Sequence, residues 1–452
     1  MHAYIQTARE NRRAREQLRD QYPSRRLIAG PSGIAPAPIA SLQTLDRLAH
    51  DLTPQVDLED CFLVASMHLL LDSDAVLRKL EGWGLDPRCA VVYGKPYSTN
   101  LAVVAALLER GYTVHASSYA MDAEIPLGRS VEAMAHDALV EIFARWDRAG
   151  SGRRIVLADD GGTLIRVALA CFGDRVGTLA AVEHTSRGIF ELEHTVLPIP
   201  TVNVARSWAK LQFESGYIGE SVDAHLEQRI GGLDPNASAL VVGCGAIGAA
   251  VAACLRARGL EVLTYDPAVC ASSEPYERLL SRADLVFGCT GRTSLDRPHW
   301  PYIKPGAMLV SCSSLDHEFA AWKLRVRPQS RAVAVVSDDG LHRGTVGGRP
   351  IFLGDPDDPA HYWYCVEIEP DRTVHVLNGG CPINFSGAGI SMPHAKSELT
   401  VSLLLAGIAQ ASAERQVGLV PLDRAVQERM VSLHNSHVRR EPAGRGDTAP
   451  PP

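Results

Sequence analysis

Residues 238–266 read Ser-Ala-Leu-Val-Val-Gly-Cys-Gly-Ala-Ile-Gly-Ala-Ala-Val-Ala-Ala-Cys-Leu-Arg-Ala-Arg-Gly-Leu-Glu-Val-Leu-Thr-Tyr-Asp. The pattern predicts a buried strand, a tight turn, an alanine-rich helix and a second strand that ends in an acid. Gly243 allows the turn, Gly245 lets the backbone approach a ligand, and Gly248 lets the helix pack close to the strand. The unpaired N–H groups of the first helical turn would then face a phosphate group.

Asp266 completes this unit at the end of the second predicted strand. It stands about 20 residues after Gly243, where an acid binds the ribose 2′-hydroxyl in Rossmann dinucleotide sites. No basic residue adjoins it, and the carboxylate would repel a 2′-phosphate, so the stretch predicts NAD rather than NADP as the cofactor. The predicted cofactor-binding residues of this unit are Gly243, Gly245, Ala246, Ile247, Gly248 and Asp266.

The composition is that of a globular protein, with 46% hydrophobic and 21% charged residues over 452 positions, enough for two or three domains. A net charge of −7 without a basic stripe argues against nucleic acid as a partner. The histidines and cysteines show no metal-ligand spacing, so we expect no metal and reduced thiols. No apolar run reaches the ~18 residues of a membrane span, and the charged N-terminus does not resemble a signal peptide. We therefore expect a cytoplasmic protein without membrane contact.

Strand and helix patterns alternate on both sides of the glycine-rich unit. They predict an α/β protein of two doubly wound parallel-sheet domains, with an NAD-binding Rossmann domain inserted in the substrate domain. The predicted divisions are an N-terminal helical segment at 1–55, a substrate domain at 56–215 completed by 395–435, the Rossmann domain at 216–394, and a disordered tail at 439–452.

Several stretches between residues 88 and 435 resemble the S-adenosylhomocysteine hydrolase family. The family's Asp-Asp-Gly-Gly strand end stands at 159–162, and its Glu-Glu-Thr-Thr-Thr-Gly turn is altered to Glu-His-Thr-Ser-Arg-Gly at 183–188. Its Asn-Val…Ser…Lys…Phe-Asp helix is matched at 203–214, where glutamate replaces the aspartate, and its Val-Asn pair becomes Ile-Asn at 383–384. In that family NAD oxidises the substrate's 3′-hydroxyl, a base removes the C4′ proton, the 5′-thioether leaves, water adds and the ketone is reduced again.

The resemblance implies a role for each matched residue. Lys210 would accept the hydroxyl proton during oxidation, and Asp160 would be the C4′ base. Glu214, which is one methylene longer than the family's aspartate, would pair with Lys210 at i, i+4. Around the nicotinamide half of the cofactor the resemblance implies contacts from Thr185, Ser186, Thr290 and Asn384.

Departures from the family pattern concern the substrate pocket. Lys95–Asn100 is matched to the family's His-Met-Thr-x-Glu-Thr stretch, which holds the adenosine. His184 takes the place of a ribose-binding glutamate and is the fourth catalytic candidate, while Ser314 and Met392 replace two histidines. Either His184 or His394 would supply the missing imidazole, and the sequence leaves this open.

These features predict a divergent, adenosylhomocysteinase-like enzyme that transiently oxidises a secondary alcohol of a nucleoside-like or specialised metabolite. Two alternatives stay open: genuine S-adenosylhomocysteine hydrolysis, and a non-catalytic protein that senses NAD or binds a partner. We expect a small-molecule substrate and a homo-oligomer, with a dimer favoured. The sequence names neither the substrate nor the net redox outcome.

Overall fold

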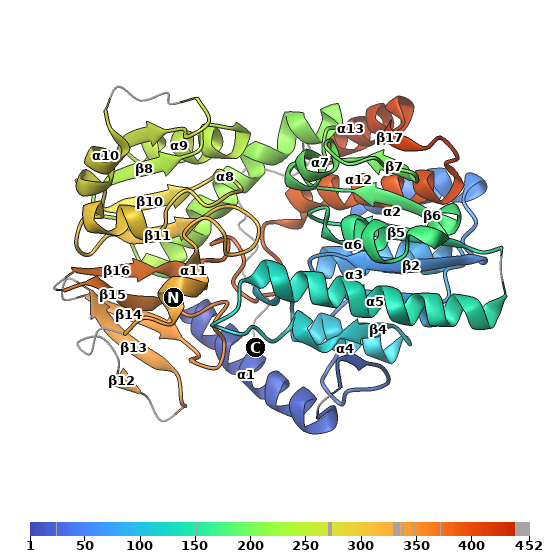
Figure 1. The fold of residues 1–452 in the computed structure, drawn as a ribbon, viewed down its shortest axis with the longest axis horizontal. Coiled ribbons are helices and arrows are strands. Elements are labelled where there is room, and N and C mark those ends of the chain that lie inside the picture. Colours follow the sequence, from blue (N-terminus) through green and yellow to red (C-terminus); the bar gives the residue numbers. More distant parts are fainter. Residues whose placement is uncertain are drawn as a thin grey trace.

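A computed structural model of the chain describes residues 1–23, 25–150, 152–269, 274–328, 335–336, 339–346, 349–370 and 372–438. Two α/β lobes lie side by side, each built around one large sheet (Figure 1). The tail predicted to be disordered, 439–452, lies outside the described residues. Among the helices described, none combines the length and the apolar character needed to cross a membrane.

The first lobe contains an eight-stranded sheet in the order β1-β4-β3-β2-β5-β6-β7-β17. All neighbours pair in parallel except β1 with β4. The chain builds outward from β2 to β4 and then returns to β5 on the other side of β2, so β2 and β5 flank the switch point where such sheets bind ligands. The strands are β1 (Leu27–Ile28), β2 (Cys61–Ser66), β3 (Ala90–Tyr93), β4 (Thr113–His115), β5 (Arg154–Asp159), β6 (Leu179–Glu183), β7 (Pro200–Asn203) and β17 (Gly418–Pro421).

Continuous apolar runs form these strands because helices cover both faces of the sheet. Along β2, Leu63 and Ala65 enter one core, whereas Phe62 and Val64 enter the other. This alternation is the period of two that a strand imposes on its side chains. The helices of this lobe are α2 (Gln43–Leu52), α3 (Leu71–Gly82), α4 (Leu101–Glu109), α5 (Leu127–Ala149), α6 (Thr163–Cys171), α7 (Ser186–Leu192), α12 (His394–Ala413) and α13 (Arg424–Val438).

The second lobe contains a six-stranded sheet in the order β15-β16-β11-β10-β8-β9. Its strands are parallel except β15, and its switch point lies between β8 and β10. The elements are β8 (Ser238–Val242), α9 (Ala246–Ala257), β9 (Glu261–Tyr265), α10 (Tyr276–Arg282), β10 (Leu285–Gly288), β11 (Met308–Ser311), α11 (Ala321–Arg325), β15 (Tyr364–Glu369) and β16 (Arg372–Val376). The predicted fold class, two doubly wound sheets with the second inserted in the first, is confirmed.

Two helices connect the lobes. Helix α8 (Trp208–Ile230) packs on α9 of the second lobe and on α12 and α13 of the first. The predicted boundary at 215/216 falls inside this helix, and the exact domain limits remain a prediction. Helix α1 (His2–Gln21) lies across both lobes and contacts α4 and β14 (Figure 1).

The segment 1–55, predicted to be helical, also contributes β1, which pairs with the edge strand β4. A small antiparallel sheet lies beside the second lobe and consists of β12 (Val335–Val336), β13 (His342–Val346) and β14 (Arg349–Gly354). The buried Arg15 guanidinium of α1 donates to Asp355 and Asp358 just beyond β14, at 2.6 and 2.7 Å. These contacts attach the N-terminal helix to the inserted part of the chain.

Candidate functional site

Four ionisable side chains follow neighbouring strands of the first lobe. His68, Lys95, Asp160 and His184 stand directly or almost directly after β2, β3, β5 and β6. Since these strands are parallel, their carboxyl ends meet at one edge of the sheet. The order β3-β2-β5-β6 therefore gathers the four residues around the switch point.

Asp160 is the centre of this cluster. Lys95 Nζ donates to the Asp160 carbonyl at 3.0 Å and also pairs with the Asp160 carboxylate. His68 Nε2 lies 3.5 Å and His184 Nδ1 4.0 Å from Asp160 Oδ2. The side chains of Lys95 and Asp160 are 2% and 6% exposed, so this charge pair is shielded from water.

The surroundings set the protonation of the cluster. Burial by itself raises the pKa of Asp160, but the Lys95 ammonium, together with His68 and His184, holds it well below its usual range. Burial lowers the pKa of His68 to about 4, although the Asp160 carboxylate opposes that shift. Asp160 is therefore an anion and His68 a neutral imidazole at neutral pH.

Lys210 and Glu214 lie one turn apart on α8 and join the same cluster. Lys210 is buried, donates its Nζ proton to the His184 carbonyl, and lies 3.1 Å from Glu214 Oε1. Thr400 of α12 donates to Glu214 at 3.3 Å, and its carbonyl lies 3.2 Å from His184 Nε2. The structure thus brings together the four predicted catalytic residues, Lys210, Asp160, Glu214 and His184.

A second pair of buried carboxylates, Asp159 and Glu183, supports the loops that carry the cluster. Glu183 accepts hydrogen bonds from the backbone of Gly161, Gly162 and Thr185, at 3.2, 2.9 and 2.6 Å. Asp159 accepts from the Ile165 N–H at 2.9 Å. Burial raises the pKa of Asp159 to about 7 and also raises the pKa of Glu183, so these acids fix backbone rather than carry permanent charge.

Thr185 and Ser186 begin α7 next to this site. Thr185 Oγ1 donates to Glu183 Oε1 at 2.7 Å and accepts from the Gly188 N–H at 3.0 Å, which caps the helix. Ser186 is exposed. The predicted contact of both residues with a nicotinamide remains a prediction.

The glycine-rich turn after β8 has the geometry that its spacing predicts. Gly243 has φ +97°, and a Cβ there would lie 2.8 Å from the Cys289 carbonyl, while a Cβ on Gly248 would lie 1.9 Å from the Gly243 oxygen. Gly245, by contrast, has no atom within 4 Å of its Cβ position. Ala246 and Ile247 form the first turn of α9. The residues present therefore fit a pyrophosphate held on exposed backbone N–H groups.

Asp266 lies just after β9 and faces this turn. Its Oδ2 accepts from the Cys244 N–H at 2.7 Å and its Oδ1 from the Ala268 N–H at 2.9 Å. A carboxylate has about four acceptor positions, so Asp266 retains capacity for a ribose hydroxyl. It also ties the glycine-rich turn to the second strand.

Thr290 follows β10, where its hydroxyl donates to Glu318 Oε2 at 2.9 Å. The buried Glu318 carboxylate also accepts from Ser294, Ser313 and the Gly291 N–H, and burial raises its pKa. Asn384 is buried beside Ile383, whose N–H donates to the Ser311 carbonyl at the end of β11. Both predicted cofactor residues thus lie at the carboxyl edge of the second sheet.

The sequence did not single out His68 as a site residue. It placed Lys95 only in the stretch that departs from the family's adenosine-holding residues. The ring of His68 stacks on Phe385, with 4.6 Å between centroids, and its Nδ1 bonds to Ser98. The available signal was a polar residue just after a buried apolar strand, a position that Asp160 also occupies. His394 bonds to Asp72 at the start of α3, and its proposed substitution for a family histidine remains a prediction.

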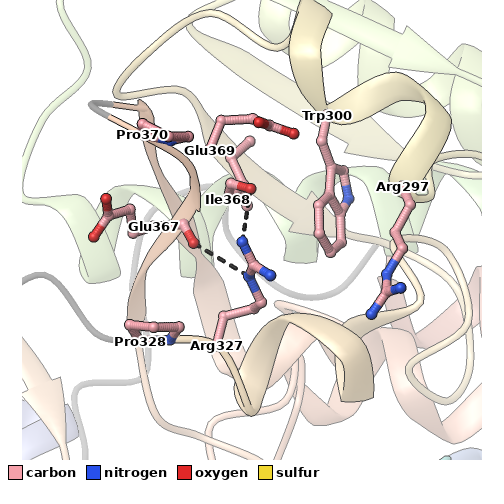
Figure 2. A pocket seen from close by; sticks show the side chains of 8 residues that line it. All are labelled: Arg297, Trp300, Arg327, Pro328, Glu367, Ile368, Glu369 and Pro370. Atoms are coloured by element: carbon pink, nitrogen blue, oxygen red, sulfur yellow. Dashed lines mark hydrogen bonds between the residues drawn. The ribbon is translucent and has the colours of Figure 1, made fainter.

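The second lobe has a cavity of about 480 Å³, separate from the residues described above. Trp300, Arg297, Arg327 and the end of β15 line it (Figure 2). Because β16 is parallel to β11 and begins near this cavity, the cavity lies at the amino edge of the second sheet, opposite the glycine-rich turn. Within the described ranges, no group of three or more histidine, cysteine or acidic residues has the arrangement of a metal site.

Comparisons with known proteins give one substantial sequence match. No family model matches the chain. An uncharacterized protein of Mycobacterium tuberculosis, Rv0104 in strain H37Rv and MT0113 in strain CDC 1551, is 35% identical over 364 residues. The alignment covers 79% of this chain, which spans only 65% of the length of those relatives.

Solved structures are similar only at a low level. An NAD-dependent formate dehydrogenase from Staphylococcus aureus with NAD is 14% identical, with a TM-score of 0.24, over 35% of this chain and 57% of its own. A D-isomer specific 2-hydroxyacid dehydrogenase from Lactobacillus delbrueckii is 15% identical, with a TM-score of 0.23, over 42% and 70%. The TT0316 protein from Thermus thermophilus is 17% identical, with a TM-score of 0.29, over 56% and 74%. Such scores carry no functional argument.

Proposed function

We propose that this protein is an NAD-dependent enzyme that oxidises a secondary alcohol on a small, nucleoside-like metabolite. The observation that carries the proposal is the cluster of Asp160, Lys210, Glu214 and two histidines at one switch point, in which Asp160, Lys210 and His184 are buried, together with a dinucleotide-type turn at the other. Helix α8 carries Lys210 of the cluster. The same helix packs against α9, which begins at the glycine-rich turn, and its Gly219 lies close to Ala250.

Bound NAD would accept a hydride from the alcohol carbon. The hydroxyl proton would pass to a group of the cluster. Lys210, held by the His184 carbonyl and Glu214, is placed to relay that proton along the pair. Its burial meets a requirement of this role, because a lysine that faced bulk solvent at this position could not serve as a relay.

Asp160 is a poorer base than the sequence suggested. A carboxylate whose pKa lies well below its usual range gains little by taking a proton. His68, neutral and 3.5 Å away, is the better acceptor. We therefore assign to His68 the uptake of the carbon-bound proton, the role that the resemblance gave to Asp160. Asp160 then has an electrostatic role beside His68.

Genuine S-adenosylhomocysteine hydrolysis remains a second candidate, favoured by a specific observation. Residues 68–73 read His-Leu-Leu-Leu-Asp-Ser, which keeps the histidine, the acid four positions later and the following hydroxyl of the family's His-Met-Thr-x-Glu-Thr stretch. The resemblance described above places that stretch at 95–100 instead. The position of His68 beside Asp160 supports matching the stretch to 68–73 rather than to 95–100. With this match the pocket differs less from that of the family.

Two measurements test these candidates. The purified protein should carry or bind NAD in preference to NADP, which mass spectrometry of the released cofactor and calorimetric titration would show. Equal affinity for both nucleotides would contradict the assignment. Homocysteine release from S-adenosylhomocysteine, at a rate on the order of 10 s⁻¹ that Lys210→Met abolishes, would select the second candidate. NADH formation only with other secondary alcohols would select the first.

A further inference from the structure

Lys95 makes a contact that the proposed chemistry does not explain. It follows β3, whereas its partner Asp160 follows β5, and β2 lies between these strands in the sheet. The Lys95 side chain therefore bridges the end of β2, the strand that leads into His68. This placement puts a buried ammonium and a buried carboxylate next to the histidine side chain.

The loops that carry these groups are held rigidly together. The Leu69 N–H donates to the Ser98 carbonyl at 3.0 Å, and the Asn100 N–H donates to the Leu69 carbonyl at 2.9 Å. Thr99 Oγ1 donates to the Lys95 carbonyl at 2.9 Å. These bonds join the segment after β2 to the segment after β3, so Lys95 and His68 keep a fixed relation.

We propose that Lys95 is a positioning residue, which holds Asp160 as a permanent carboxylate and leaves His68 as the neutral group that takes up the substrate's proton. The inference deepens the proposed function and rests on it, since oxidation of an alcohol or an elimination requires such an acceptor. Lys95 itself does not touch the reacting atoms in this assignment. Its ammonium already donates to the carbonyl and the carboxylate of Asp160.

Burial is the main cause of the lowered pKa of His68, and Lys95 adds to it by opposing the Asp160 carboxylate. The charged or titratable groups that act on it are Asp160 after β5, Lys95 after β3, His184 after β6 and Lys210 on α8. The remaining neighbours, Ser98, Tyr97 and Phe385, are uncharged. Without Lys95, the Asp160 carboxylate would act on His68 unopposed and stabilise its imidazolium, so the pKa of His68 would rise.

The test is an NMR titration of histidine rings in the ligand-free protein. Protein labelled with ¹³C at histidine Cε1 would be titrated as wild type and as Lys95→Met, Lys95→Gln and Lys95→Arg, with His68→Asn to assign the signal. The His68 midpoint should rise by about 1 pH unit or more in the Met and Gln variants, because a nearby opposite charge produces shifts of that size. The charge-retaining Arg variant should restore the wild-type midpoint.

Controls make the result decisive. Lys304→Met removes a lysine from an ion pair with Asp284 in the second lobe and should leave the His68 midpoint unchanged. The Gln variant keeps a hydrogen-bond donor and serves if the Met variant does not fold. An unchanged His68 midpoint in the neutral variants, or the same rise in the Arg variant, would overturn the proposal. Since no cofactor or substrate is present, failure of this test is distinguishable from failure to bind NAD.

Discussion

The carboxyl edges of the two sheets present different chemical groups, ionisable side chains at one and exposed backbone at the other. At the edge of the eight-stranded sheet, buried ionisable side chains contact one another, with Asp160 paired to Lys95 and flanked by two histidines. At the edge of the six-stranded sheet, Cys244, Gly245 and Ala246 are exposed and offer backbone rather than charge. The topology is of one type, yet one edge is suited to proton chemistry and the other to holding a polyanion.

The difference shows where each function is encoded. A buried charge is tolerated only with a partner, so the first edge depends on residues from several strands at once. A phosphate-binding turn needs only conformational freedom and open space, so the second edge depends on three glycines close in sequence. Five predictions test this contrast, and they are arranged from the largest expected effect to the smallest.

Asp160→Asn should be the most costly change at the first edge. It leaves the Lys95 ammonium buried without a counter-charge, and breaking a buried pair in this way costs about 3–5 kcal/mol of unfolding free energy. Denaturant unfolding at pH 7 would measure the loss. Asp86→Asn, which removes an exposed partner of Arg88, is the matched control and should leave stability unchanged. If Asp160→Asn lowered the free energy of unfolding by less than about 1 kcal/mol, the pairing of the buried charges would not be needed for the stability of this edge.

The wild-type pair should also respond to acid. The folded-state pKa of Asp160 lies below its unfolded value, so its stabilising contribution is present above about pH 4 and is lost as pH falls through the folded pKa. This dependence should be missing from Asp160→Asn.

At the second edge, Gly248→Ala and Gly245→Ala should separate folding from binding. An alanine at 248 would press on the Gly243 oxygen and should cost about 3 kcal/mol or more. At 245 the backbone has negative φ and no atom lies near the new methyl group, so stability should hold while NAD affinity falls. Thermal unfolding and calorimetric titration would measure the two effects. Full NAD affinity in Gly245→Ala would contradict the assigned turn.

Asp266→Ala should weaken NAD binding by about 1–3 kcal/mol, the range for a lost hydrogen bond to a charged group. The partly exposed carboxylate also holds the Cys244 N–H, so part of the loss would come from a looser turn. NADP affinity should rise relative to NAD because the repulsive charge is gone. Equal losses for both nucleotides would show that the carboxylate orders the turn without reading the ribose.

Asp159→Asn should have the smallest effect at acid pH, where the wild-type carboxyl is also neutral, and a reversed pH dependence. Burial raises the pKa of Asp159 to about 7, above its unfolded value, so its stabilisation is present below about pH 4 and is lost as pH rises through 7. An asparagine still accepts from the Ile165 N–H and never ionises. The variant should therefore gain stability relative to wild type as pH rises from about 4 to about 7, between the unfolded and folded pKa values of Asp159. A constant difference across that range would show that Asp159 is already ionised in the folded protein.

Much of the fold follows from local patterns. The glycine-rich unit at 238–266 forms the strand, turn, helix and second strand that its pattern predicts. The strands at 61–66, 90–93, 113–115 and 154–159 are likewise short apolar runs bounded by turn signals. The strands β13, β14, β15 and β16, which pair with one another in antiparallel hairpins, were missed. Their residues alternate weakly, and pairing between distant segments, rather than local preference, makes them strands.

Among the site residues, local sequence determined those whose role depends on backbone. Gly243, Gly245 and Gly248 could be assigned from spacing alone, since their conformational demands arise within one turn. Only the tertiary structure decided that Lys95 pairs with Asp160 across β2 and that His68 lies beside them. Those contacts join residues from three strands, and their energies depend on burial that no single stretch of sequence specifies.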